Sequence, residues 1–237
     1  MMNGFARLAG VGLVGSVLAV ATAHADGSTP YVVSGNDHII IGITLDEGAV
    51  RAALPEGLEP AEGITGGLNV YRSGGGEGVA AYERTYVWVD LANFDSLTGN
   101  KGRYILWLAD SAHAAKMAKI GYDTTTGATS IAEDGRAVTG STVLDGAEVM
   151  KVAIELADAA CGPAVGTMNY PSLPAGKDAL AATQYTFSGT ACGATPVSVD
   201  ISAPEGHPLA TFKPQSVIWA AMVRDLSFSA SPLLPIQ

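Results

Sequence analysis

The dominant feature of this sequence is a long succession of short, β-prone segments that alternate with turn-forming residues. Runs rich in Val, Ile, Thr, Tyr and Trp are separated by Gly, Asp and Pro, and only two segments are typical of short helices. The expected strands are residues 38–43, 64–72, 79–91, 103–108, 128–132, 136–144, 148–156, 165–170, 182–188, 196–201 and 217–228. This pattern predicts an α+β chain of mostly antiparallel strands, barrel-like or sandwich-like, with helices at its periphery.

Two short helices are expected. Thr44 begins the sequence Thr-Leu-Asp-Glu, a capping-box pattern, and the helix that follows should reach residue 53, because Pro55 disfavours helical conformation just before it. The second helix should span residues 113–120, with Asp110 or Ser111 as its cap and Gly121 as its end. We expect His113, in its first turn, at the surface.

The N-terminal segment has the pattern of a signal peptide. Arg7 precedes an apolar run over residues 8–23, and Ala23-His24-Ala25 has the small-x-small form of a cleavage site. The run is short for a membrane span, which favours cleavage after Ala25 over anchoring. We therefore expect residues 1–25 to be removed and residues 26–237 to form one exported domain, periplasmic or secreted.

The two cysteines, Cys161 and Cys192, both lie in the expected mature chain. In an oxidising compartment an even count predicts a disulfide, although two buried thiols or a metal pair are the alternatives. The formal net charge is −10 and the cations are scattered, which excludes nucleic acid and anionic membranes as partners. Association into a homo-oligomer stays open.

The alternation of side chains along the expected strands singles out two charged residues, Glu83 and Arg224. Glu83 shares a face with Thr85, Val87, Val89 and Leu91, so it either lies at the end of a buried row, where its pKa would rise, or meets solvent or an arginine. Arg224 lies in an otherwise apolar row of residues 218–228. It could pair with Glu83, bind a carboxylate ligand, or mark the point where the strand leaves the core.

The stretch from residue 120 to 127, Ile-Gly-Tyr-Asp-Thr-Thr-Thr-Gly, has the composition of a turn that lines a pocket. It places Tyr122, Asp123 and Thr124 directly after the second helix. We expect these three residues to contribute to a ligand site.

The order of these segments resembles the acetoacetate decarboxylase-like family. The matching pieces are Leu-Pro-Glu-Gly-Leu-Glu at residues 54–59, Tyr82-Glu83, Gly121-Tyr122 before a strand-Asp-Gly-strand unit, and His-Pro-Leu-Ala-Thr-Phe-Lys-Pro at residues 207–214. Together they cover most of the expected mature chain. The resemblance implies a cone-like closed β-barrel around a small, mostly apolar cavity.

The reactive lysine of that family is missing at the matching position. In the family a lysine that ends a Gly-aromatic-Pro-Lys turn forms an imine with a β-keto acid. Here Gly121 and Tyr122 are followed by Asp123 and Thr124, and threonine cannot form an imine. Of the family's other cavity groups, the arginine falls at Thr44, one carboxylate falls at Asn69, and only the glutamate, at Glu83, is kept.

These observations predict an exported ligand-binding protein. The ligand would be a small organic molecule, keto- or hydroxy-acid-like or apolar, with Tyr122, Asp123, Thr124, Arg224, Asn69 and Thr44 as candidate contacts. The alternative is a lyase or hydratase that uses Glu83 as general acid/base on a small carbonyl substrate. No Gly-x-Ser-x-Gly or His-Glu-x-x-His pattern occurs, and we expect no cofactor and no metal.

Overall fold

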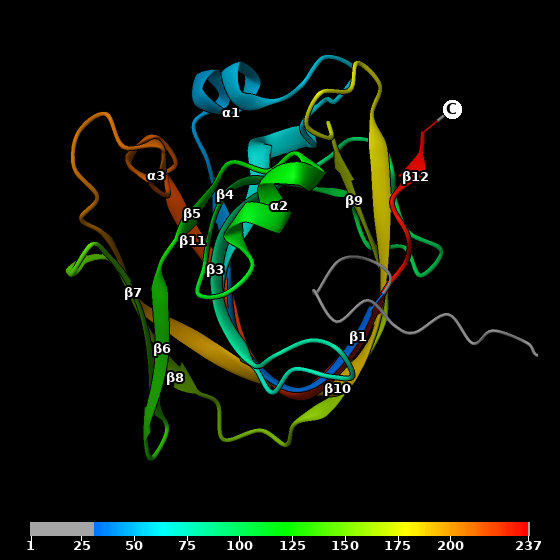
Figure 1. The fold of residues 1–237 in the computed structure, drawn as a ribbon. Coiled ribbons are helices and arrows are strands. Elements are labelled where there is room, and N and C mark those ends of the chain that lie inside the picture. Colours follow the sequence, from blue (N-terminus) through cyan, green and yellow to red (C-terminus); the bar gives the residue numbers. More distant parts are fainter. Residues whose placement is uncertain (1–30, 237) are drawn as a thin grey trace, which may run out of the picture.

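The computed structural model describes residues 31–236, which form one twelve-stranded sheet with short helices attached (Figure 1). The expected signal peptide and its cleavage site lie outside the described residues. The strands are β1 (Tyr31–Thr44), β2 (Thr65–Ser73), β3 (Tyr82–Asp90), β4 (Arg103–Asp110), β5 (Thr124–Thr126), β6 (Ala128–Asp134), β7 (Ala137–Leu144), β8 (Ala147–Leu156), β9 (Gly162–Ser172), β10 (Ala181–Ile201), β11 (Ser216–Ala230) and β12 (Leu234–Pro235). The helices are α1 (Glu47–Ala53), α2 (Ala114–Ile120), α3 (Pro208–Thr211) and the short 3₁₀ turn η1 (Glu62–Ile64).

The prediction of a closed barrel is wrong. The strands follow the order β5-β4-β3-β2-β1-β11-β10-β8-β7-β6, and β9 and β12 pair with β10 beside this path. The two end strands, β5 and β6, do not pair with each other. Instead β6 packs face-on against β2, β3 and β4, so the sheet folds back over itself and stays open. Figure 1 shows β6, β7 and β8 as a layer beside the curved remainder of the sheet.

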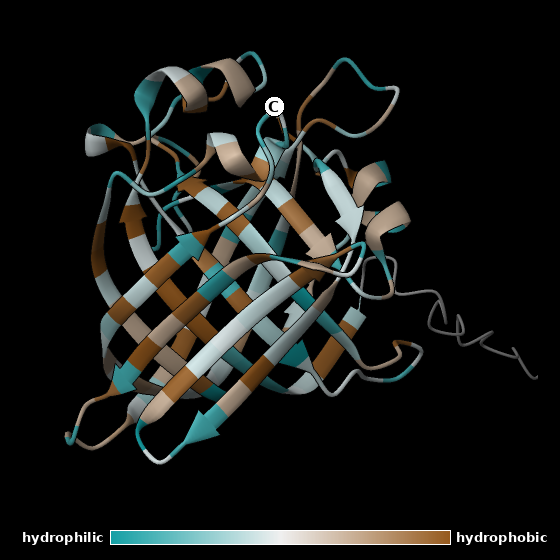
Figure 2. Ribbon diagram, turned by 90° about the vertical axis from the view of Figure 1, so that its left-hand side faces the viewer, coloured by the Kyte–Doolittle hydropathy of each residue, from teal (hydrophilic) through white to brown (hydrophobic). Residues whose placement is uncertain are grey.

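Both faces of the sheet are covered, so its buried side chains form two separate clusters, one on each face. Alternate residues of β1, β2 and β3 point to opposite sides, and Figure 2 shows the resulting alternation of hydropathy along the strands. The interlayer core, which includes Ile41, Leu68 and Val87, fills the space between these strands and the layer of β7 and β8. The cavity cluster, which includes Tyr71, Tyr86 and Trp88, lies on the other face.

Both expected helices are present, but their caps differ from the prediction. At α1 it is Asp46, not Thr44, whose side chain accepts from the backbone N–H of Ala49, at 2.8 Å. The Thr44 hydroxyl instead contacts Ser216 Oγ at 2.7 Å, because Thr44 still pairs with β11 as the last residue of β1. At α2 the N-cap is His113, not Asp110 or Ser111, and it makes no side-chain cap hydrogen bond. The carboxylate of Asp110 accepts from the backbone N–H groups of Ala112 and His113 just before the helix.

Two strand predictions change in detail. Residues 182–188 and 196–201 belong to one strand, β10, which crosses from β11 to β8. The long apolar row expected in β11 is interrupted at Asp225, whose φ of 49° marks a left-handed residue. Met222 therefore joins the interlayer core, whereas Leu226 and Phe228 join the cavity cluster.

A disulfide between Cys161 and Cys192 is confirmed, with the two sulfur atoms bonded at 2.07 Å. It fastens the segment before β9 to the middle of β10. Within residues 31–236, no helix is both long and apolar enough to cross a membrane.

Candidate functional site

A cavity of about 130 Å³ opens within the cavity cluster, on the concave face of the sheet. Its walls come from β1, β2, β3, β4, β9, β10 and β11. The lining residues are His38, Ile40, Asn69, Tyr71, Arg84, Tyr86, Arg103, Ile105, Ala164, Met168, Tyr170, Tyr185, Phe187, Val223, Leu226 and Phe228. Within the described residues the lining has two arginines and no aspartate, glutamate or lysine.

Tyrosine dominates the surroundings of this cavity. Seven of the chain's eight tyrosines belong to or pack against the cavity cluster: Tyr31, Tyr71, Tyr82, Tyr86, Tyr122, Tyr170 and Tyr185. Burial raises the pKa of Tyr82 to about 12 and the pKa values of Tyr71, Tyr86 and Tyr185 further above the usual value. These hydroxyls therefore stay protonated at neutral pH and can donate hydrogen bonds.

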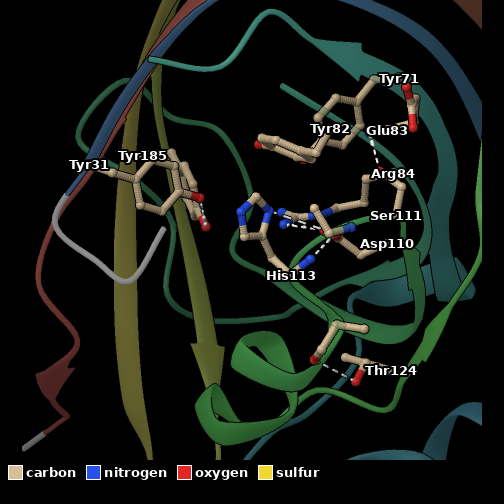
Figure 3. Close-up of polar contacts among 12 residues, drawn as sticks. Tyr31, Tyr71, Tyr82, Glu83, Arg84, Asp110, Ser111, His113, Thr124 and Tyr185 are labelled. Atoms are coloured by element: carbon tan, nitrogen blue, oxygen red, sulfur yellow. Dashed lines mark hydrogen bonds and ion pairs between the residues drawn. The ribbon is translucent and has the colours of Figure 1, made fainter. Parts of the chain in front are cut away.

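Arg84 is fixed by a buried ion pair. Its Nε lies 2.6 Å from Oδ2 of Asp110, and the two side chains are 7% and 0% exposed. Burial alone would raise the pKa of Asp110, but Arg84 and the backbone N–H groups of His113 and Ala112 outweigh it and lower the pKa below its usual value. Figure 3 shows Arg84 from β3, Asp110 from the end of β4 and His113 from the start of α2 converging on one point.

His113 belongs to this cluster, so the prediction that it lies at the surface is wrong. Its side chain is 9% exposed, and Nδ1 lies 3.8 Å from Oδ1 of Asp110. Its ring meets the ring of Tyr82 edge-on, with centroids 5.1 Å apart. The short helix α2 is thus held against the cavity cluster through its first residues.

A chain of polar contacts runs along one side of the cavity. His38 Nδ1 lies 3.2 Å from Oδ1 of Asn69, Nδ2 of Asn69 donates to the Tyr86 hydroxyl at 2.8 Å, and the hydroxyls of Tyr86 and Tyr170 are 3.2 Å apart. Burial lowers the pKa of His38 to about 4, against the opposing effect of its hydrogen bond to Asn69. His38 is therefore neutral at pH 7.

Arg103 supplies the second charge at the cavity. Its guanidinium lies 4.3 Å above the ring of Trp88, and its Nε is 3.4 Å from Oδ1 of Asp90. The same Asp90 oxygen accepts from the indole N–H of Trp88 at 3.1 Å. The Arg103 side chain also hydrogen-bonds to Tyr170, whereas its Nε makes no hydrogen bond within residues 31–236. Its carboxylate partner is farther away than that of Arg84, at 3.4 Å against 2.5 Å.

Of the residues predicted to bind a ligand, Asn69 lines the cavity. Tyr122 is buried in the cavity cluster without lining the cavity, and Asp123 is exposed. The Thr124 hydroxyl donates to the carbonyl of Ala114 at 3.0 Å, which ties β5 to α2 (Figure 3). Thr44 lies at the end of β1 and is also absent from the lining.

Glu83 and Arg224 lie apart from the cavity and from each other. Glu83 lines a second hollow with Tyr71, Arg72, Thr129, Ser130 and Ile131, and of these only Tyr71 also lines the cavity. Arg224 forms a two-pronged ion pair with Glu133, at 2.9 and 2.6 Å, instead of pairing with Glu83. The aliphatic row that contains Glu83 faces the interlayer core, and the neighbouring Arg84 points to the cavity cluster.

Neither lysine near the turn replaces the missing reactive amine. Lys119 is exposed, Lys116 is half-buried, and neither lines the cavity. Among the described residues there is no group of three or more His, Cys, Asp or Glu side chains that could hold a metal ion.

Sequence reasoning missed His38 and Arg103. A signal for the first was present, because the expected strands place His38 and Ile40, Asn69 and Tyr71, and Arg84 and Tyr86 at alternate positions of three consecutive strands. That shared polar-aromatic alternation marks one face of one sheet. Arg103, as the first residue of an expected strand, had no comparable signal.

The curved, mostly antiparallel sheet with a cavity on its concave face defines an acetoacetate decarboxylase-like fold. The structure is similar to acetoacetate decarboxylase from Legionella pneumophila (TM-score 0.67, 12% identity, 98% of each chain covered). It is also similar to an acetoacetate decarboxylase-like enzyme from Sphingomonas wittichii (TM-score 0.60, 16% identity, 87% of this chain and 92% of the other). A third similar structure is the enduracididine biosynthesis enzyme MppR in complex with pyruvate (TM-score 0.65, 10% identity, 89% and 91%).

The sequence itself matches no protein-family model and no protein of curated function. The likeness to solved structures confirms the resemblance to the acetoacetate decarboxylase-like family at the level of the fold. At these identities it assigns no residue a role.

Proposed function

We propose that the protein binds a small organic acid in the cavity of its sheet and that it does so without forming an imine. The observation that carries this proposal is the charge of the lining, which has Arg84 and Arg103 but neither a carboxylate nor a lysine among the described residues. Such a cavity favours an anion. It also has no amine that could attack a carbonyl carbon.

The size and walls of the cavity restrict the ligand further. The cavity volume of about 130 Å³ restricts the ligand to a small molecule. Aliphatic and aromatic side chains form most of the wall, including Ile105, Met168 and Phe187. A keto or hydroxy acid with a short apolar body meets both conditions.

Arg103 is the better candidate for the anion-binding residue. The charge of Arg84 is matched by Asp110 in a direct buried pair, whereas Arg103 shares Asp90 with the indole of Trp88. A ligand carboxylate near Arg103 would find a partly buried cation with an unpaired N–H. The complex of the similar enzyme MppR with pyruvate, itself a small keto acid, is consistent with this ligand class.

The lyase alternative rests on Glu83, and no observation favours it. Glu83 lines the second hollow and not the cavity, so a substrate in the cavity would need another acid or base. The confirmed disulfide is compatible with an extracellular or periplasmic location. It supports the further proposal that the chain is exported after cleavage behind Ala25.

Calorimetry with a panel of short keto and hydroxy acids, and with their neutral amides, tests the proposal. We expect the acids to bind and the amides to bind at least tenfold more weakly, because a hydrogen bond to a charged group contributes about 1.5–3 kcal/mol. Arg103→Met should weaken acid binding by a similar factor. The matched control is Arg136→Met, which removes an exposed, ion-paired arginine outside the cavity lining.

Two results would contradict the proposal: no acid binds, or Arg103→Met binds acids as tightly as the unchanged protein. Borohydride treatment in the presence of acetoacetate tests the second part of the proposal, that no imine forms. We expect no covalent adduct by mass spectrometry, and a stoichiometric adduct would restore imine chemistry.

A further inference from the structure

Two tyrosine hydroxyls and one arginine come together on one side of the cavity wall. Tyr86 from β3, Tyr170 from β9 and Arg103 from β4 all line the cavity. Tyr86 and Tyr170 are 8% and 7% exposed, and their hydroxyls lie 3.2 Å apart. The Arg103 side chain hydrogen-bonds to Tyr170. Three hydrogen-bonding groups from three strands are thus connected by direct contacts.

Each hydroxyl of this tyrosine pair already accepts a hydrogen bond from a neighbouring side chain. A guanidinium can only donate, so the Tyr170 oxygen is the acceptor in its bond with Arg103. The Tyr86 oxygen accepts from Nδ2 of Asn69 at 2.8 Å. Each tyrosine therefore keeps its own hydroxyl hydrogen for a further bond.

One of these two hydroxyl hydrogens has no protein acceptor. At 3.2 Å one hydroxyl can donate to the other, but that bond uses only one of the two hydrogens. Among residues 31–236 neither hydroxyl has a further hydrogen-bond partner, and no aspartate or glutamate lines the cavity. Water can serve as the acceptor in a solvated cavity, and a charged acceptor on a ligand replaces it with a stronger bond.

Arg103 contributes positive charge at this place, but it already has a carboxylate nearby. Its Nε is 3.4 Å from Oδ1 of Asp90, and both side chains are 18% exposed. The charge that a ligand meets is therefore partly compensated. The hydroxyl hydrogens differ, because no carboxylate of the described residues bonds to them. An ionised carboxylate, which accepts hydrogen bonds at two oxygens and donates none, is complementary to this set of donors.

We propose that Tyr86, Tyr170 and Arg103 together form the carboxylate-binding site of the cavity, with a hydroxyl hydrogen of the tyrosine pair donating to the ligand. This inference rests on the proposed function and deepens it, because it assigns two further binding residues to the same ligand. It also restricts the ligand atom at this place to a hydrogen-bond acceptor, which excludes an ammonium group. The tyrosines act here by direct contact with the ligand, not by holding Arg103 in place.

The test uses α-ketoisovalerate and α-hydroxyisovalerate, which share a carboxylate and a short apolar body. Calorimetry at about pH 7 compares Tyr86→Phe, Tyr170→Phe and the double variant with the unchanged protein. The double variant should bind both acids roughly tenfold more weakly or worse, because it lacks both hydroxyl hydrogens. Each single variant should lose about threefold or less, since the remaining hydroxyl no longer bonds to its neighbour and can donate to the ligand.

The matched control is the double variant Tyr71→Phe/Tyr185→Phe. These two tyrosines also line the cavity, and the substitutions likewise remove two hydroxyls and keep both rings. Their hydroxyls contact Tyr82 at 3.3 Å and Tyr31 at 3.4 Å, neither of which lines the cavity. The control should bind both acids within about twofold of the unchanged protein.

The outcomes separate this inference from the proposed function. If Arg103→Met weakens acid binding but Tyr86→Phe/Tyr170→Phe does not, the inference is overturned while the proposed function stands. The inference also fails if Tyr170→Phe alone loses as much affinity as the double variant, because the hydroxyl would then act by holding Arg103. An equal loss in the control would assign the effect to the polarity of the whole wall and overturn the inference as well. If neither acid binds the unchanged protein, the inference and the proposed function both fail.

Hydrogen exchange decides the question if the double variant does not fold. Tyr170 lies on β9, which among the described strands pairs with β10 alone, so a ligand held by Tyr86 and Tyr170 connects β9 to β3. In the unchanged protein, α-ketoisovalerate should therefore slow amide exchange in β9 more than in β6, which has no residue in the cavity lining. Equal slowing in the two strands, or none, overturns the inference.

Discussion

The two faces of the central strands have different chemistry, although the same strands build both. The interlayer core is mainly aliphatic, and its buried hydroxyls are paired: Thr85 contacts Thr129 at 2.9 Å and Thr142 at 2.7 Å. The cavity cluster holds seven tyrosines, a buried ion pair and a histidine with an unpaired nitrogen. The interlayer core therefore stabilises the fold by apolar packing, whereas the cavity face holds polar groups to which a ligand could hydrogen-bond.

The largest expected effect on stability comes from the buried ion pair on the cavity face. Asp110→Asn would leave Arg84 buried without its counterion, because both side chains are almost fully covered. Breaking such a pair costs about 3–5 kcal/mol in the free energy of unfolding. Urea unfolding measures it, and the control is Asp158→Asn at an exposed arginine pair, where the change should be far smaller. Equal effects at the two sites would contradict the difference in burial.

Shortening a buried side chain should mainly reduce stability on one face of the sheet and mainly alter ligand affinity on the other. Leu68→Ala in the interlayer core removes a side chain that is 0% exposed, which should cost about 2–5 kcal/mol of stability. Acid affinity should stay the same in the folded fraction. Ile40→Ala on the cavity wall should show the reverse pattern, with a smaller loss of stability and altered affinity. Calorimetry and urea unfolding on both variants check this, and a change in affinity for Leu68→Ala would show that the faces are coupled.

The pH dependence of stability should come from the cavity cluster. His38 has its folded pKa lowered to about 4 from the ordinary 6.5, so its contribution is fully present above pH 6.5 and is lost as the pH falls toward 4. The shift corresponds to about 3 kcal/mol. Urea unfolding at pH 7 and pH 4 should show this loss, and His38→Phe should remove most of it. If stability falls equally with pH in both proteins, the titration belongs to groups other than His38.

The strands of this fold could be predicted because their alternation is local. β2, β3 and β7 lie within a few residues of their predicted bounds. The sequence predicts two strands, residues 182–188 and 196–201, where the structure has the single strand β10. The structure accommodates Pro196 at an irregularity in the pairing with β8. That irregularity depends on the partner strand, which the local sequence does not specify.

The position of the cavity could not be predicted by the same reasoning. For β3 the sequence correctly separates the face of Glu83 and Val87 from the face of Arg84 and Tyr86. Both faces are buried, so hydrophobicity does not distinguish a packed core from a cavity wall. The unclosed sheet is equally non-local, because it results from β6 packing over β2 and β3 instead of pairing with β5. Asn69 lines the cavity, whereas the Thr124 hydroxyl is bonded to α2.

The smallest expected effect concerns the residue that the sequence favoured for catalysis. Glu83 is half-buried beside the second hollow, and only Tyr71 lines both that hollow and the cavity. Glu83→Gln keeps the shape and removes the charge, so acid affinity should change by about twofold or less, which is the range of substitutions outside a binding site. Arg224→Gln should behave likewise, because Arg224 is already paired with Glu133. Calorimetry on both variants, with Arg103→Met as the positive comparison, checks this. A tenfold loss for Glu83→Gln alone would mean that ligand binding extends across the sheet, and the division of labour between its two faces would have to be abandoned.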